Sequence, residues 1–238
     1  MPKNEGKRMQ PSIIIPAFNE GGTIQTLIDA IRAVHPQAQI VIADDGSQDF
    51  GGEGVTAAGV HLIHHPYNIG NGAAVKTGIR NATGDVLIFM DADGQHRPAS
   101  VGSLIEAMRE LGADVVIGSR FLQGSYRMGV ARKIGSRIFS HIARAYTGVR
   151  ITDPTSGFQL LNREAFAYLA EGDNYPLDYP DVNIIMALHK KNFRIAEAPV
   201  AMTENSTGKS MHDGLRPLYY VVKMFLAIVM VLMKRKGR

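Results

Sequence analysis

Short, continuously apolar runs alternate along this chain with longer segments in which apolar residues recur every three or four positions. Such runs are too short for helices and predict buried strands; they cover residues 12–15, 38–43, 59–63, 85–90 and 113–117. The helical spacing predicts helices at 23–34, 72–81, 98–111 and 129–146. Strands that alternate with helices indicate an α/β fold with a mostly parallel sheet and helices on both faces.

The ends of these predicted elements suggest where a ligand would bind. Pro16 is expected to end the first strand, and Thr23 is a good N-cap candidate for the first helix. The polar loops 16–22, 44–49 and 91–96 each follow a strand, and α/β sheets bind ligands at the carboxyl ends of their strands. His64–His65 is interpreted as a surface feature of a strand end rather than a pair of metal ligands.

Two carboxylates directly follow the fourth predicted strand. Residues i and i+2 of an extended chain point to the same side, so Asp91 and Asp93 can converge on one cation, with Gln95 next in register. Oxygen ligands favour Mg²⁺ or Mn²⁺, particularly when a diphosphate completes the coordination. The alternative is a solvated turn, where Asp and Gly are common.

Composition narrows the chemistry. The 238 residues suit one large α/β domain, or one domain with an appendage. The chain has no cysteine, which excludes disulfides, thiolate metal sites and cysteine nucleophiles. Neither G-x-G-x-x-G after the first strand nor a P-loop occurs, so dinucleotide and P-loop chemistry find no support.

The net charge of +4 comes from the two ends of the chain. Seven of the 26 basic residues, but one of the 22 acidic residues, lie in residues 1–10 and 234–238. This distribution argues against a basic nucleic-acid-binding face. It fits a nearly neutral body with cationic ends that can touch an anionic membrane.

The C-terminal segment is apolar. Residues 224–233 contain no polar side chain, and a spanning helix needs about 20 apolar residues. Residues 217–233 fall short of that length and contain Lys223. We expect an interfacial or re-entrant helix anchored by Tyr219, Tyr220 and the basic tail, with a core or oligomer-interface helix as the alternative.

An ordered set of motifs resembles a known enzyme family. The set comprises Ile15-Pro-Ala-Phe-Asn-Glu20, Ala43-Asp-Asp-Gly-Ser-Gln-Asp49, Asn68-Ile-Gly-Asn-Gly72, Met90-Asp-Ala-Asp-Gly-Gln-His96 and Gly118-Ser-Arg120. It is similar to the family 2 glycosyltransferases, and most similar within them to the polyprenyl-phosphate glycosyltransferases. The resemblance runs from about residue 11 to 213 and implies the Rossmann-like GT-A fold. With the polar N-terminal residues and the apolar C-terminal segment, it divides the chain into a disordered leader at 1–10, a GT-A domain at 11–213, and a membrane-interacting helix with a basic tail at 214–238.

The resemblance also implies a donor site. Asp91, Asp93 and Gln95 would hold Mg²⁺ or Mn²⁺ and, through it, the diphosphate. The implied nucleotide-sugar site comprises Pro16, Ala17, Glu20, Asp44, Asp45, Ser47, Lys76, Asp91 and Asp93. Asp44 would read the edge of the base, because a carboxylate accepts from a uracil or guanine N–H. An Asx-turn after the strand is the alternative for residues 44–47.

The acceptor side is implied in the same way. The acceptor-phosphate candidates are Arg120, Arg132, Ser136, Arg137 and Lys209. Arginine suits phosphate because its planar fork donates two parallel hydrogen bonds. From the residues alone, 129–146 is an amphipathic surface helix with a solvated basic face. Relatives usually carry an arginine where this chain has Asn205, and Lys209 is the alternative cation in that candidate lid loop.

The candidate catalytic acids are Asp93, Asp153, Asp178 and Asp181. Asp153 would organise the acceptor side, and the last two fall where relatives that glycosylate hydroxyls carry an acid. A hydroxyl needs a general base. A phosphate monoester, with a second pKa of about 6, is already an anion and needs none.

These expectations combine into one functional hypothesis. The protein would be an inverting, metal-dependent enzyme that moves a hexose from a UDP- or GDP-sugar to a polyprenyl phosphate at the cytoplasmic face of the membrane. Its expected partners are the donor, the lipid and the membrane surface; a small integral-membrane partner and self-association are left open. The alternatives are transfer to a glycan hydroxyl with Asp178 or Asp181 as base, and a non-catalytic nucleotide-sugar-binding scaffold subunit.

Overall fold

The computed structural model describes residues 9–49, 59–122, 130–176 and 182–202, together with Leu226 and Val229. Most of the expected leader and of the expected C-terminal helix therefore lies outside the described residues. Within the described part, no helix is long and apolar enough to cross a membrane.

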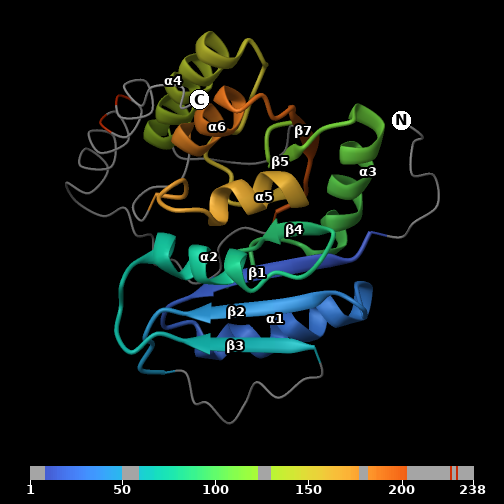
Figure 1. Ribbon diagram of the computed structural model, residues 1–238, viewed down its shortest axis with the longest axis vertical. Coiled ribbons are helices and arrows are strands. Elements are labelled where there is room, and N and C mark those ends of the chain that lie inside the picture. Colours follow the sequence, from blue (N-terminus) through green and yellow to red (C-terminus); the bar gives the residue numbers. More distant parts are fainter. Residues whose placement is uncertain are drawn as a thin grey trace.

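A seven-stranded sheet forms the centre of the molecule, in the order β3-β2-β1-β4-β6-β5-β7 (Figure 1). The strands are β1 (Pro11–Ala17), β2 (Gln39–Asp44), β3 (Val60–His64), β4 (Val86–Phe89), β5 (Val115–Ser119), β6 (Gln159–Asn162) and β7 (Ile195–Pro199). β6 is antiparallel to both of its neighbours, β4 and β5, whereas the other pairs are parallel. The predicted α/β class with a mostly parallel sheet is confirmed.

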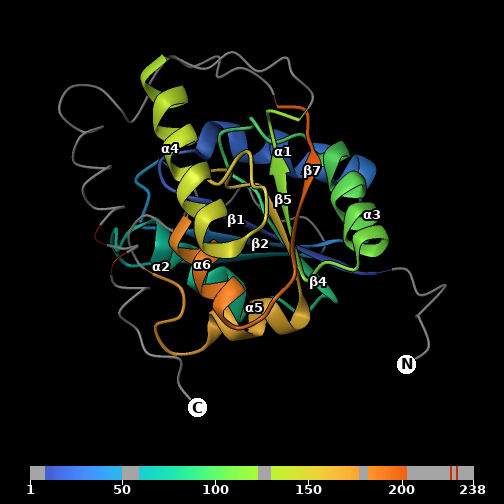
Figure 2. The same ribbon diagram turned by 90° about the horizontal axis from the view of Figure 1, so that it is seen from above.

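Helices cover both faces of the sheet (Figure 2). They are α1 (Gly21–Val34), α2 (Asn71–Arg80), α3 (Val101–Leu111), α4 (Val130–Thr147), α5 (Arg163–Ala170) and α6 (Val182–Lys190), with a short 3₁₀ turn, η1 (Pro98–Ser100), before α3. α1 and α3 pack on one face, and α2, α4, α5 and α6 pack on the other.

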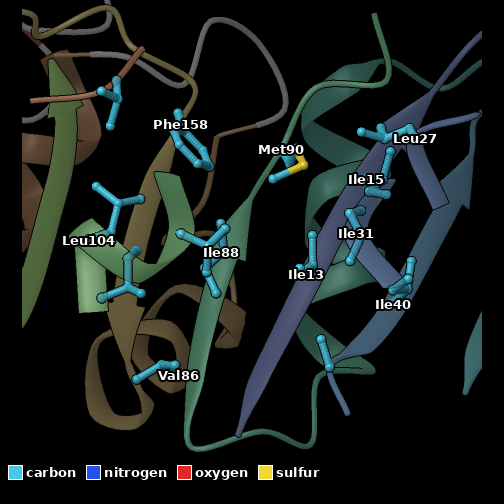
Figure 3. Packing of buried hydrophobic residues seen from close by; sticks show 14 of the residues in the cluster. Ile13, Ile15, Leu27, Ile31, Ile40, Val86, Ile88, Met90, Leu104 and Phe158 are labelled. Carbon is cyan, nitrogen blue, oxygen red and sulfur yellow. The ribbon is translucent and has the colours of Figure 1, made fainter. Parts of the chain in front are cut away.

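Alternation along the strands divides the core into two clusters. Ile13 and Ile15 of β1 point to the face covered by α1 and α3, whereas Ile14 points to the face covered by α2. Figure 3 shows the cluster on the face covered by α1 and α3, in which Ile13 and Ile15 lie beside Ile31 of α1. Strands buried on both faces explain the continuous apolar runs, because every residue of such a strand meets a helix layer.

Two local predictions need correction. β1 does not stop at Pro16 but continues to Ala17, because Pro16 and Ala17 still pair in register with Ala43 and Asp44 of β2. Thr23 is not the N-cap of α1. That position is Glu20, and the Thr23 hydroxyl instead donates to the carbonyl oxygens of Glu20 (3.0 Å) and Ala92 (2.9 Å). Thr23 therefore connects the first helix to the Asp91–Asp93 loop.

Candidate active site

Several loops meet at the carboxyl edge of β1, β2 and β4. The Ser47 hydroxyl accepts from the Asn19 N–H (2.8 Å), and the Asn19 side chain accepts from the Gln48 N–H (3.1 Å). Asn19 has a positive φ of 56°, a conformation that Asn tolerates better than most residues. These bonds join the loops after β1 and β2, as expected for strand ends that share one edge.

Asp44, the last residue of β2, is fully buried. Its carboxylate accepts from the Ser47 N–H (3.3 Å) and from the Ser47 hydroxyl, and it is paired with the His64 ring of β3. The Asx-turn geometry and the predicted binding role are compatible, because the turn fixes the carboxylate. His64 is about half exposed, so the pair lies at the edge of the site.

Asp45 is buried within a hydrogen-bond network. Its carboxylate accepts from His65 Nδ1 (2.8 Å) and from the N–H groups of Ile69 (3.0 Å) and Gly70 (2.7 Å). Burial alone would raise the pKa of Asp45, but these hydrogen bonds outweigh it and lower the pKa. Asp45 thus shapes the loop before α2.

The interpretation of His64–His65 as a mere surface feature is wrong for His65. His65 is buried, and its two ring nitrogens lie 2.8 Å from Asp45 Oδ1 and 2.9 Å from Thr77 Oγ1 of α2. His64 is the last residue of β3 and His65 directly follows it. Successive residues of an extended chain point to opposite sides, which accounts for the different environments of the adjacent histidines.

Asp91 and Asp93 lie in the loop that follows β4. The Asp91 carboxylate is half exposed, and Asp93 Oδ1 accepts from the Gln95 N–H (2.9 Å). Desolvation by the surrounding loops and the nearby Asp91 charge raise the pKa of Asp93. Desolvation and the Asp93 charge likewise raise the pKa of Glu20. Negative charge therefore accumulates where the sequence places the cation.

This donor set fits a hard divalent cation. Among the described residues, no three histidine, cysteine or carboxylate side chains are grouped so as to hold a metal by themselves. Mg²⁺ is typically bound through one or two carboxylates plus substrate phosphates, with water in the remaining positions. Two carboxylates with the Gln95 amide, at a site open to a diphosphate, match that pattern.

A buried histidine lies behind the first of these carboxylates. The Asp91 N–H donates to His96 Nδ1 (2.9 Å), and His96 Nε2 lies 3.5 Å from Asp91 Oδ2. The ring stacks on Phe158, with centroids 4.8 Å apart and planes 17° apart. Burial lowers the pKa of His96 and favours the neutral ring.

On the acceptor side, Arg120 and Asp153 form a buried bidentate ion pair. Arg120 Nε and one terminal nitrogen lie 2.6 and 2.7 Å from the two Asp153 oxygens. The Asp153 carboxylate is therefore already engaged, and its role in organising the acceptor side stays a prediction. Likewise, the Arg120 guanidinium is committed largely to Asp153, which makes its predicted role in binding acceptor phosphate indirect.

Glu197 of β7 also holds the Thr152–Asp153 loop in place. Its carboxylate accepts from the Thr152 N–H, the Thr152 hydroxyl and the Asp153 N–H at 2.8–2.9 Å. Desolvation raises the pKa of Glu197 despite these bonds. The loop that carries Asp153 is therefore fixed by a strand at the far edge of the sheet.

A pocket of about 420 Å³ lies beside this loop. Its lining residues are Phe121, Ser136, Arg137, Ser140, His141, Arg144, Arg150 and Thr152. Three arginines face it, and none forms an ion pair with another described residue. The Ser140 hydroxyl donates to the Ile151 carbonyl and ties α4 to the loop. The pocket offers a concentrated positive charge suited to an anion.

The remaining predicted residues are distributed as follows. Pro16 and Ala17 end β1 next to the Asp44–Asp45 loop. Lys76 is directed to the segment after α5, where its ammonium group donates to the Gly172 carbonyl and lies 3.4 Å from Asp173. The side chain of Arg132 and the whole of Lys209, Asp178 and Asp181 lie outside the described residues.

Sequence reasoning missed five residues with clear places in this arrangement: His65, His96, Arg144, Arg150 and Glu197. A basic stripe on α4 was visible in the sequence and signalled Arg144. The other four depend on contacts between distant segments or on the burial of a single ring, for which the local pattern gives no signal.

Solved structures define the class of fold. Glucosyl-3-phosphoglycerate synthase from Mycobacterium tuberculosis, in complex with phosphoglyceric acid, superposes with a TM-score of 0.70 at 18% identity, covering 94% of this chain and 80% of that one. The same enzyme in complex with Mn²⁺, UDP and glucosyl-3-phosphoglycerate gives a TM-score of 0.66 at 20% identity, covering 96% and 80%. The protein therefore has the GT-A-like α/β fold.

The family follows from the sequence comparison. The model of glycosyl transferase family 2 matches residues 12–169, and the chain belongs to this family of enzymes. An undecaprenyl-phosphate mannosyltransferase from Micrococcus luteus is 29% identical over 87% of this chain and 88% of that protein. A polyprenol monophosphomannose synthase from Mycolicibacterium smegmatis is also 29% identical, over 85% and 80%. The resemblance seen in the motifs is confirmed.

Proposed function

We propose that this glycosyltransferase moves a hexose from a nucleoside diphosphate sugar to a polyprenyl phosphate, with inversion at the anomeric carbon. The observation that carries the proposal is the arginine-lined pocket next to the Thr152–Asp153 loop. Three guanidinium groups suit a phosphate, to which each can donate parallel hydrogen bonds. The names of the M. luteus and M. smegmatis relatives support a polyprenyl phosphate as its source.

The donor side follows from the carboxylate loops. Asp44 would accept from the base, with His64 at its edge, while Asp45 and Ser47 hold the loops around it. Asp91, Asp93 and Gln95 would hold the cation next to the diphosphate. When bound, Mg²⁺ or Mn²⁺ would neutralise charge on the departing nucleoside diphosphate. The Mn²⁺–UDP complex of the M. tuberculosis enzyme supports such a cofactor for this fold.

The ion pair with Arg120 makes Asp153 a poor general base, whereas Asp178 and Asp181, the bases of the hydroxyl alternative, lie outside the described residues. A hydroxyl acceptor needs a general base within hydrogen-bond reach. Asp153 is bound by both arms of Arg120 and is fully buried, so it is poorly placed to take a proton. A phosphate oxygen needs no base and can attack the anomeric carbon opposite the leaving diphosphate, which inverts that carbon.

A lipid acceptor also implies that the protein works at a membrane surface. We place the protein at the cytoplasmic face of the membrane, where its donor is available, bound peripherally through its apolar C-terminal segment and basic ends. A small integral-membrane partner would also hold the protein at the membrane. Self-association remains a further expectation from the sequence.

The test follows nucleoside diphosphate release by the purified protein with Mg²⁺ or Mn²⁺. The donor panel begins with GDP-mannose, because the relatives are named as mannosyltransferases, and includes UDP-glucose and UDP-galactose. We expect release to depend on added polyprenyl phosphate and to fall at least 100-fold in Asp93→Asn. Asp29→Asn, which changes an exposed carboxylate of α1, should retain wild-type release.

Two results would count against the proposal. Equal release with and without lipid would show that the lipid is not the acceptor. Donor binding without turnover on any lipid phosphate would favour the scaffold alternative.

A further inference from the structure

His96 contacts Asp91, the first of the predicted cation ligands, at two points. Its Nδ1 accepts from the Asp91 backbone N–H at 2.9 Å, so this nitrogen carries no proton. The proton of the neutral ring is then on Nε2, which lies 3.5 Å from Asp91 Oδ2. The His96 ring therefore contacts both the backbone and the carboxylate of Asp91.

The ring itself has little freedom to move. It is 2% exposed and stacks on Phe158, which belongs to the buried cluster shown in Figure 3. The backbone of His96 also forms an antiparallel bridge with Met202, beyond the end of β7. A rigid ring fixes the residue that it contacts, because both of its nitrogens stay in place.

The Asp91 carboxylate is confined from a second direction as well. A Cβ atom added to Gly157 would lie 3.1 Å from Asp91 Oδ2, so the glycine backbone passes close to the carboxylate. The Arg120–Asp153 pair lies close enough for both charges to act on His96, in opposite directions. His96 is thus within electrostatic reach of both the predicted cation ligands and the Arg120–Asp153 pair.

We propose that His96 is a positioning residue that orients the Asp91 carboxylate for the divalent cation. The inference rests on the cation site of the proposed function. His96 does not touch the cation; it holds the ligand that does. Removing a partner that orients a metal ligand typically costs about 10–100-fold in metal affinity. We expect a loss of that size for His96→Ala.

The experiment measures Mn²⁺ affinity rather than turnover. Free Mn²⁺ is quantified by electron paramagnetic resonance in the presence of saturating UDP or GDP, for the wild type, His96→Ala, His96→Gln and Asp91→Asn. His96→Ala should weaken Mn²⁺ binding at least 10-fold, while nucleotide affinity without metal stays within about twofold. His96→Gln, whose amide N–H can take the place of Nε2–H, should recover most of the affinity.

A stability control separates positioning from folding. Met108→Ala removes a side chain of α3 that belongs to the same buried cluster as Phe158 but forms no hydrogen bond with Asp91 or His96. It should lower the melting temperature about as much as His96→Ala but leave Mn²⁺ affinity unchanged. Equal losses of Mn²⁺ affinity in these two variants would overturn the proposal, as would wild-type affinity in folded His96→Ala.

The Mn²⁺-binding experiment tests the role of His96 independently of the proposed acceptor. If lipid-dependent turnover fails but His96→Ala still loses Mn²⁺ affinity, the positioning role holds and the acceptor is wrong. If the wild type binds no Mn²⁺, or if Asp91→Asn binds it normally, the cation site fails and the positioning role fails with it.

Discussion

The adjacent carboxylates Asp44 and Asp45 have different hydrogen-bond partners. Asp44 is held by a turn and a half-exposed histidine at the edge of the sheet, whereas Asp45 is enclosed by His65 and two backbone N–H groups. The sequence identified both aspartates through their position after a strand. It could not assign them separate environments, because His65 is 20 residues away from Asp45 and reaches it only through the pairing of β2 with β3.

The lowered pKa of Asp45 predicts a pH-dependent contribution to stability. Because hydrogen bonds favour its ionised form in the folded state, this contribution is present above the unfolded pKa of about 3.9 and is lost as pH falls through the lower folded pKa. Asp45→Asn should reduce the free energy of unfolding by roughly 1–3 kcal/mol at neutral pH. Urea unfolding at pH 7 and near pH 3 should show the difference shrinking in acid. A pH-independent difference would contradict this account.

At the scale of elements, the sequence predicted β1 to β5 from continuous apolar runs and α1 to α4 from apolar residues at helical spacing. It did not predict β6, β7, α5 or α6. β6 has four residues and leads directly into α5 at Arg163, so the two periods overlap. The insertion of β6 antiparallel between β4 and β5 depends on long-range pairing, which no local pattern encodes.

Close packing of α2 on β1 gives a prediction at this scale. A Cβ added at Gly78 would lie 2.1 Å from the Cγ2 atom of Ile14, a branched side chain in the buried strand. Gly78→Ala should destabilise the protein by about 1–3 kcal/mol through overpacking. The measurement is the midpoint of thermal or urea unfolding.

Gly102→Ala is the matched control. Gly102 lies in α3 with no atom within 4 Å of an added Cβ, so alanine should stabilise the helix by up to about 1 kcal/mol. Similar stability changes in both variants would show that helix propensity, rather than contact with β1, determines the outcome at Gly78.

At the scale of the whole molecule, the site has two parts. In the proposed function, the carboxylate loops after β1, β2 and β4 would bind the donor, whereas β5, α4 and the Thr152–Asp153 loop would bind the acceptor. The sequence located both parts through motifs. It could not show that Asp153 is neutralised by Arg120, because the two are 33 residues apart. The sequence did indicate the basic face of α4, and the fold adds that Arg137 and Arg144 of this helix line one pocket together with Arg150.

Because the proposed donor and acceptor sides are separate, substitutions on one side should change the KM for the acceptor without changing donor affinity. Arg144→Ala should raise the KM for polyprenyl phosphate about 10-fold or more, because a hydrogen bond to a charged group contributes roughly 1.5–3 kcal/mol. Donor affinity, measured by calorimetry, should not change. Arg80→Ala on the exposed end of α2 is the control and should leave both quantities unchanged. Equal effects of Arg144→Ala on donor and acceptor would contradict the assignment of the pocket to the acceptor.

The measurement that tests the central claim most directly compares two acceptors that differ only in the phosphate. The purified protein is incubated with its donor, Mn²⁺ or Mg²⁺ and either a polyprenyl phosphate or the corresponding polyprenol, and the lipid products are identified by mass spectrometry. The account predicts a hexose on the polyprenyl phosphate and none on the polyprenol. Glycosylation of the polyprenol at a comparable rate would contradict it, because the arginine pocket would then contribute nothing to acceptor choice.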